Sequence, residues 1–370
     1  MIVALVAGMF VLTGVAALTV DAGVLYAERR VVQNGADAAS LALAQACAHL
    51  DTAGCSELSP DLADLANLNS PDGLTDIESV CGSTAPFESC GALPANPALV
   101  ECTKLPPDLP EAAKWVEVRT RTLSATANPS VVTKFFANLS DPSYDGTGVK
   151  ACARSAWGAP SGGSPTIPVT ISACEWNNLT ADGTRLIPPG PYNDPYQSPD
   201  PSPGGAYPLP GPLTYQKRIL LHDPTGSTNC PAGPSGADLP GGFGWLATAS
   251  GCSVTVSATG WVNDDPGNSP PSGCDLAPLV GHTAYIPIYQ DTNGLNGGNG
   301  QYLLNGVAAF YFTGYSIPSQ RPKSIATNTR LCTPSQTCIY GWFTTGVMPS
   351  GSLGSDSGTP RGAIAVGVAG

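Results

Sequence analysis

The sequence predicts an α+β protein, in which a long N-terminal helix, transmembrane in its first half, precedes a mostly β, disulfide-rich extracytoplasmic domain. Three observations support this prediction. The first twenty residues carry no charged side chain, and twelve cysteines follow. Charged residues make up only 12% of the chain, whereas Gly and Pro number 43 and 37. That composition favours short strands joined by turns over a large helical protein.

The N-terminal helix is predicted over residues 2–48. At 1.5 Å per residue, the uncharged run makes about 30 Å of helix, the thickness of a bilayer's hydrocarbon core. Beyond it, apolar residues recur at three- and four-residue steps, and no proline interrupts them. We therefore expect one nearly continuous helix of about 70 Å, membrane-buried first and amphipathic afterwards. A cleavable secretory signal and a plain membrane anchor are the alternatives.

The residues after the apolar run follow a distinctive order. Residues 17–30 read Ala-Leu-Thr-Val-Asp-Ala-Gly-Val-Leu-Tyr-Ala-Glu-Arg-Arg, and Gln-Asn-Gly-Ala-Asp-Ala-Ala occupies 33–39. This order resembles the N-terminal signature of TadG-like proteins, in the TadE/TadG-like group of the Flp (tight-adherence) pilus assembly system. The resemblance implies a pilin-like stalk, anchored in the cytoplasmic membrane through residues 1–20, whose partners are other pilin-like subunits of the Tad machinery. The residues expected to carry assembly are Val20, Asp21, Gly23, Leu25, Tyr26, Arg29, Arg30, Val32, Gln33, Asn34, Asp37, Ala38 and Ala39.

The cysteines indicate the compartment. No Cys-x-x-Cys pair occurs and the three histidines are scattered, which opposes zinc and thioredoxin-type sites. An even number of cysteines after a membrane segment indicates disulfides in an oxidising space, so the chain beyond the stalk is expected outside the cytoplasm or on the cell surface. Short separations favour Cys47–Cys55 and Cys332–Cys338 as pairs. The full set of candidates is Cys47, Cys55, Cys81, Cys90, Cys102, Cys152, Cys174, Cys230, Cys252, Cys274, Cys332 and Cys338.

Four regions are expected along the chain. Residues 1–50 form the stalk, and 51–110 a cysteine-rich insertion with a short helix after Ser59-Pro60. Residues 111–157 form a small αβ part: a strand at 114–127, a helix bearing Phe135 and Phe136, and a strand at 149–157. That order also resembles the TadG-like module. Residues 158–370 form a β-rich domain with a proline-rich loop at 188–213.

The β-rich domain is expected to contain seven strands and almost no helix, as a β-sandwich or irregular barrel. Its aromatic residues either fill the core, which is favoured, or form an exposed binding platform. The predicted strands are 166–172, 215–222, 254–259, 284–290, 302–315, 338–347 and 362–368, and the aromatic residues are Trp176, Phe243, Trp245, Trp261 and Trp342.

No catalytic, cofactor or metal site is predicted. The Asp264-Asp265 pair lies in a Pro/Gly/Asn turn and is expected to be solvent-exposed. The stretch from Asp291 to Gly294 begins like a calcium loop, but Leu295 and Tyr302 occupy ligand positions, so a hairpin tip is expected. The metal motif of the von Willebrand A-type domain found in some family members is absent. A net charge of −12 opposes nucleic acid as a partner.

The leading hypothesis is therefore a membrane-anchored, non-enzymatic pseudopilin or minor pilin of Flp/Tad pilus assembly that contributes to adhesion. Its amphipathic stalk, residues 20–46, is expected to cover its apolar face with the helix of Phe135 and Phe136 or with a partner stalk. The alternatives are a stand-alone anchored surface adhesin or carbohydrate-binding module, and an extracytoplasmic hydrolase.

Overall fold

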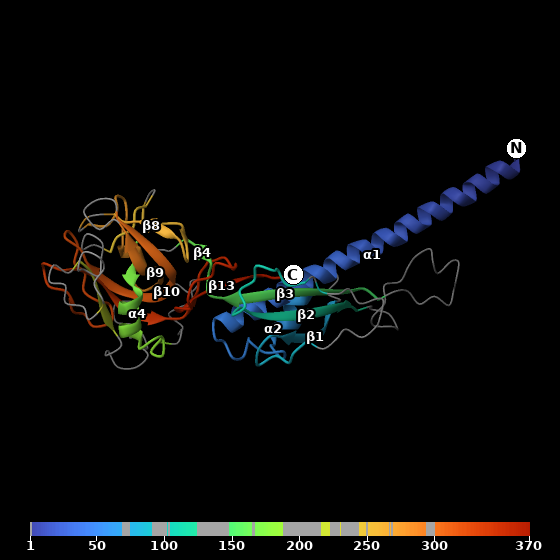
Figure 1. Ribbon diagram of the computed structural model, residues 1–370. Coiled ribbons are helices and arrows are strands. Elements are labelled where there is room, and N and C mark those ends of the chain that lie inside the picture. Colours follow the sequence, from blue (N-terminus) through green and yellow to red (C-terminus); the bar gives the residue numbers. More distant parts are fainter. Residues whose placement is uncertain are drawn as a thin grey trace.

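The chain forms an elongated molecule with a projecting helix, a small αβ layer and a larger β lobe (Figure 1). The computed structural model describes residues 2–68, 75–90, 102, 104–123, 148–164, 167–187, 216–222, 230, 244–248, 251–265, 267, 269–293 and 300–370. For residues 2–11, 13, 17, 18 and 61 it describes the backbone alone. The expected Phe135–Phe136 helix, the proline-rich loop 188–213 and the hairpin tip 294–299 lie outside the described residues.

The N-terminal helix, α1, spans Ile2–Ala48 without interruption, as the sequence predicts. Alanine and leucine, which favour the helix, outnumber its glycines, each of which costs about 1 kcal/mol relative to alanine. Gly35 also has a packing role. A Cβ at this position would lie 3.0 Å from the carbonyl oxygen of Ala66, so glycine permits the close approach of helix α2 (Asp61–Leu68).

The C-terminal half of α1 lies against a five-stranded sheet, which we call the stalk sheet. Its strand order is β1-β2-β3-β13-β12. The first four strands pair antiparallel, and β12 pairs parallel with β13. Figure 1 shows α1 and α2 beside this sheet. The strands are β1 Thr75–Gly82, β2 Lys114–Thr122, β3 Lys150–Gly158, β12 Gly346–Val347 and β13 Ala363–Val368.

The position of the last strand differs from the expectation. We expected residues 362–368 in the β-rich domain, but Val366 pairs with Trp157 of β3 in the stalk sheet. Strand alternation predicts that a segment is extended, yet it carries no information about the strand with which it pairs. The chain therefore returns from the β lobe to complete the layer that supports its N-terminal helix, and its C-terminus lies beside α1 (Figure 1).

The β lobe is built on a six-stranded sheet. Its order is β5-β9-β10-β11-β6, and β8 also pairs with β10. Beside it lies a two-stranded ribbon of β4 and β7, so the described residues do not form the two facing sheets of a sandwich. The strands are β4 Gly162–Gly163, β5 Ile171–Ser172, β6 Lys217–His222, β7 Val256–Ser257, β8 Trp261–Asn263, β9 Thr283–Asn293, β10 Gln301–Ser316 and β11 Thr337–Thr344. A 3₁₀ turn covers Ala277–Leu279.

Every strand predicted for residues 158–370 overlaps an observed strand, although β5, β7 and β12 are only two residues long. The expectation of almost no helix missed α4, Ala173–Thr180. The Ser172 hydroxyl accepts a hydrogen bond from the backbone N–H of Glu175 and caps this helix. The Ser-x-x-Glu spacing is a helix-start signal that the sequence contained. Strands β1, β4 and β8 were also not predicted.

All twelve cysteines are paired. The two predicted short loops, Cys47–Cys55 and Cys332–Cys338, are confirmed. The other four disulfides are Cys81–Cys90, Cys102–Cys152, Cys174–Cys230 and Cys252–Cys274. None joins the stalk layer to the β lobe, so each part of the molecule is cross-linked within itself.

Candidate functional site

Helix α1 consists of two parts with different surroundings. From Val32 onward, one face is buried against the stalk sheet: Val32, Ala36 and Ala39 are fully buried, and Leu43 is 1% exposed. These residues follow each other at steps of three and four, the spacing of one helix face. Each buried valine or leucine side chain contributes about 1.5–3 kcal/mol. This part of the helix therefore belongs to the molecule's own core.

Polar contacts fix the helix on the sheet. The Thr120 hydroxyl donates to the backbone carbonyl of Val32 at 2.9 Å, and the hydroxyls of Ser40 and Ser155 lie 2.9 Å apart. The Gln33 side-chain amide donates to the carbonyl of Cys152 and to Asp37, each at 2.9 Å. Because buried hydrogen bonds are directional, they set the helix in one register on β2 and β3.

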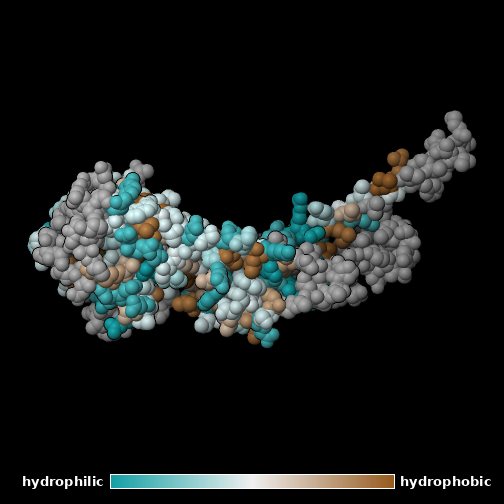
Figure 2. Space-filling view, in the orientation of Figure 1, coloured by the Kyte–Doolittle hydropathy of each residue, from teal (hydrophilic) through white to brown (hydrophobic). Residues whose placement is uncertain are grey.

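The part of α1 before Val32 presents large apolar side chains to solvent. Leu12 is 71% exposed, Val15 57%, Val20 49%, Val24 44% and Tyr26 68%. At 100° per residue these five side chains occupy a broad arc of the helix rather than one narrow stripe. Figure 2 shows hydrophobic atoms where the helix leaves the body of the molecule. We call these five residues the stalk surface.

The candidate assembly residues fall into two groups, those that are buried or half-buried and those that are exposed. The molecule's own sheet buries Val32 and Ala39. A partner stalk, one of the two covers expected for this face of the helix, therefore has no access to it. Asp21 is also buried, at 8% exposure. Leu25, Gln33, Asp37 and Ala38 are half-buried, and those left exposed are Val20, Gly23, Tyr26, Arg29, Arg30 and Asn34.

Two arginines lie at the boundary between the parts of the helix. Arg29 and Arg30 are exposed, and the Arg30 guanidinium lies 5.9 Å from the centre of the Tyr26 ring. An aromatic ring beside a guanidinium is a weak cation–π contact at an exposed site. The stalk surface is thus bordered by positive charge on the side of the folded body.

The described residues contain two groups with the composition of a metal site, each formed by two cysteines and Glu117. The sulfur atoms are in disulfides, whereas a cysteine ligand is a thiolate. The Glu117 carboxylate, fully buried, pairs with Arg119 at 2.5 Å and Arg154 at 2.6 Å. Its two oxygens are therefore already held by guanidinium groups, and the cluster is a structural ion-pair network.

The carboxylates considered in the β lobe are arranged differently from the expectation. Asp264 was expected to be solvent-exposed, but it is buried, with 8% of its surface exposed. This burial raises the pKa of its carboxyl group. It lies on a bridge with Leu246, and its backbone N–H donates to Gly300. Asp291 and Asn293 are at the end of β9, where Asn293 pairs with Gln301 in the predicted hairpin.

The large aromatic residues mostly fill the core, as favoured from the sequence. Trp245 is fully buried, Trp176 is 4% exposed and Trp342 is 5% exposed. Trp261 is 48% exposed, and Phe243 lies outside the described residues. The three buried tryptophans therefore do not form a surface platform.

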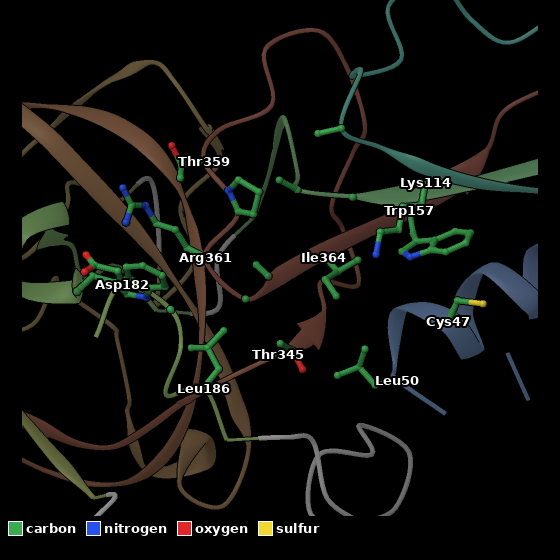
Figure 3. Close-up of a pocket in the computed structure, with 18 of the residues that line it drawn as sticks. Cys47, Leu50, Lys114, Trp157, Asp182, Leu186, Thr345, Thr359, Arg361 and Ile364 are labelled. Atoms are coloured by element: carbon green, nitrogen blue, oxygen red, sulfur yellow. The ribbon is translucent and has the colours of Figure 1, made fainter. Parts of the chain in front are cut away.

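A pocket of about 620 Å³ lies between the stalk layer and the β lobe. Figure 3 shows Trp157, Leu50 and Cys47 on one side of it, and Arg361, Asp182 and Leu186 on the other. These residues are far apart in the sequence and join only because β13 returns to the stalk sheet. Of these six residues only Cys47 was a candidate from the sequence, as a disulfide cysteine, since no local pattern links the others.

These features define a class of protein: a stalk-helix protein, in which one helix is half embedded in its own αβ layer and half projects with apolar side chains exposed. Within the described part of the chain, no helix is both long and apolar enough to cross a membrane. Residues 1–46 match the protein family described as "Putative Flp pilus-assembly TadE/G-like", which confirms the resemblance for this segment. The match indicates a role related to the Tad pilus and an association with the cell envelope. Neither a curated protein nor a solved structure matches the chain.

Proposed function

We propose that the protein is a membrane-anchored, non-enzymatic pseudopilin or minor pilin of the Flp/Tad assembly machinery. Residues 1–20 insert into the cytoplasmic membrane, and the stalk surface packs against helices of other pilin-like subunits. The β lobe lies outside the membrane and contributes to adhesion. The uncharged N-terminal run supports the anchor, and the six disulfides support an oxidising location for the rest.

The observation that carries the proposal is the change of surroundings along α1. A helix that is buried on one face from Val32 to Ala48 needs no partner there, because its own sheet covers it. The same helix extends back from Val32 to Ile2, and on this part the five apolar residues of the stalk surface are exposed. Exposed apolar surface on a continuous helix is characteristic of an interface with other helices or with lipid. Assembly therefore acts through the stalk surface rather than through the inner face.

The experiment compares two identical substitutions at similarly exposed valines. Val24 on the stalk is 44% exposed, and Val368 at the end of β13 is 62% exposed. We expect Val24→Asp to leave the fold intact but to reduce co-purification with other pilus proteins at least tenfold after crosslinking in cells. Val368→Asp, the matched control, is expected to retain co-purification.

Equal recovery of pilus proteins with both variants would refute the assignment of assembly to the stalk surface. Loss of recovery only in the control would place the interface on the stalk sheet instead. Protein levels and resistance to proteolysis are measured for both variants, so that a folding defect is distinguished from a binding defect.

The stand-alone adhesin or carbohydrate-binding module is the second candidate from the sequence. Trp261 favours it, because this ring is 48% exposed on the β lobe. One exposed ring is less than the platform of several rings that such modules use. A glycan array probed with wild-type protein and Trp261→Ala tests it. Glycan binding that Trp261→Ala abolishes would support this candidate.

A further inference from the structure

The pocket between the stalk layer and the β lobe has the size and lining of a ligand site. Its volume of about 620 Å³ is within the range of small-molecule sites, about 300–1,000 Å³. Trp157, Leu50 and Ile364 supply apolar wall from the stalk layer, and Trp176 and Leu186 supply it from the β lobe. A few polar side chains are placed among them, as in sites that orient a ligand.

Arg361 is the buried charged residue of this lining, and it lies on the β-lobe side of the pocket (Figure 3). Its side chain belongs to a residue only 5% exposed, and it extends from the segment that leads into β13 (Figure 3). Its Nε donates to the Asn305 carbonyl at 2.9 Å, and one terminal nitrogen donates to the Asn177 side-chain oxygen at 3.4 Å. The guanidinium also lies 4.8 Å from the centre of the Trp176 ring. A guanidinium has five N–H donors, so most of its donors remain unused by these contacts.

No anion balances this charge among the described residues. The ion pairs there involve Arg119, Arg121, Lys150 and Arg154, and Arg361 is in none of them. Asp182 lines the pocket but does not reach ion-pair distance from Arg361. Burial lowers the pKa of Arg361 from its ordinary value, because the charged form has lost contact with water. Buried charges in proteins are normally paired, since an unpaired one is costly.

A second donor in the same lining lacks a partner. The indole N–H of Trp176 is buried and donates no hydrogen bond, although Trp176 is 4% exposed. Buried donors in native structures nearly always have an acceptor. Trp176 and Arg361 are in ring contact, so the two unsatisfied groups lie in one place. Because the indole nitrogen is itself enclosed, an acceptor in the pocket meets the Arg361 guanidinium rather than this N–H.

We propose that this pocket binds a small ligand that carries a carboxylate on a largely apolar body. The planar guanidinium presents paired donors that match the two oxygens of a carboxylate. The body of the ligand contacts Trp157, Leu50 and Ile364, so it touches both the stalk layer and the β lobe. The exposed ammonium of Lys114 adds positive charge at the edge of the same pocket.

The test uses two matched probes with the purified full-length chain. We would follow 4-fluorophenylacetate and its neutral amide, 4-fluorophenylacetamide, by fluorine NMR. The two differ only in the group that would meet Arg361. We expect saturable binding of the acid and at least tenfold weaker binding of the amide. Equal affinity of the two probes, or no saturable binding of the acid, would overturn the proposal.

Three variants locate the binding. Arg361→Gln should weaken acid binding at least tenfold, and Trp176→Leu, which removes the ring that packs on the guanidinium and lines the pocket, should weaken it several-fold. Arg185→Gln removes the same charge from an exposed position beside α4 and should bind as the wild type does. Unchanged affinity in Arg361→Gln would overturn the proposal. If Arg361→Gln is misfolded by near-UV circular dichroism, the probe pair decides, and equal affinity of the wild-type chain for the acid and the amide then counts against the proposal.

Competition identifies the source of the carboxylate. Displacement of the fluorinated acid by glucuronate, but not by glucose, would support an acidic sugar as the ligand. Displacement by phenylacetate alone would support an apolar organic acid. Displacement by glucose and glucuronate alike would contradict recognition of a carboxylate.

Discussion

Leu43 offers the most direct measure of how firmly α1 is held by the stalk sheet. It is 1% exposed and packs in one cluster with Val116, Val118 and Trp157. Leu43→Ala removes three buried carbon atoms and leaves a cavity between the helix and the sheet. Substitutions of this kind cost about 2–5 kcal/mol. We expect the stalk layer to lose that much stability.

The assay is amide hydrogen exchange followed by mass spectrometry. Because 1.36 kcal/mol corresponds to a factor of ten, a loss of 2–5 kcal/mol accelerates exchange through opening of the layer by about 30- to 5,000-fold. Peptides from β2 and β3 should show this acceleration, whereas peptides from β10 and β11 should not. Val24→Ala, a truncation in the exposed part of the same helix, should change stability by only about 0.5 kcal/mol, or about twofold in rate.

Two results would refute this reasoning. Unchanged exchange of β2 and β3 in Leu43→Ala would show that the inner face of α1 does not stabilise the sheet. Equal acceleration in Val24→Ala would show that the exposed part of the helix is as tightly packed as the buried part.

Two further predictions concern the disulfides and Asp264. Alkylation of the native, unreduced protein is expected to label none or few of the twelve cysteines, because all are paired; labelling of most of them would contradict the pairing. Burial raises the pKa of Asp264 above its ordinary value of 3.8, so the folded state favours the protonated carboxyl. The stabilising contribution is then complete below about pH 3.8 and is lost as the pH rises through the folded-state pKa. At pH 7, Asp264→Asn should therefore be as stable as the wild type or more stable, and at pH 3 it should lose any such advantage. If the variant is instead less stable relative to wild type at pH 7 than at pH 3, the folded state favours the ionised form of Asp264. Urea unfolding of the two proteins at both pH values measures this difference.

Local patterns in the sequence predicted the individual elements well. The uncharged run and the three- and four-residue spacing of apolar side chains predicted α1 from residue 2 to residue 48, and the structure has it at Ile2–Ala48. Strand alternation located β2, β3, β9, β10 and β11 within a few residues. These features succeed because helix and strand periodicity depend on neighbours in the chain. The Ser172-x-x-Glu175 cap of α4 is also local, and it was overlooked rather than absent.

The partners of those elements depended on contacts between distant segments. Periodicity showed that Val32, Ala36 and Ala39 share one face, but not that the molecule's own sheet covers it. The same limit applies to Asp264, whose surrounding turn residues indicated exposure although long-range packing buries it.

The sequence by itself determined the long helix, its resemblance to TadG-like proteins, the oxidised state expected of the cysteines and the β-rich character of the rest. Only the tertiary structure decided that β13 returns to the stalk sheet, that α1 is divided into a buried and an exposed part, and that Arg361 meets Trp176 in a pocket between the two parts of the molecule. The physical reason is that secondary structure is specified by side chains a few residues apart. Strand pairing, burial and the grouping of charged side chains are instead set by segments up to hundreds of residues apart in the chain.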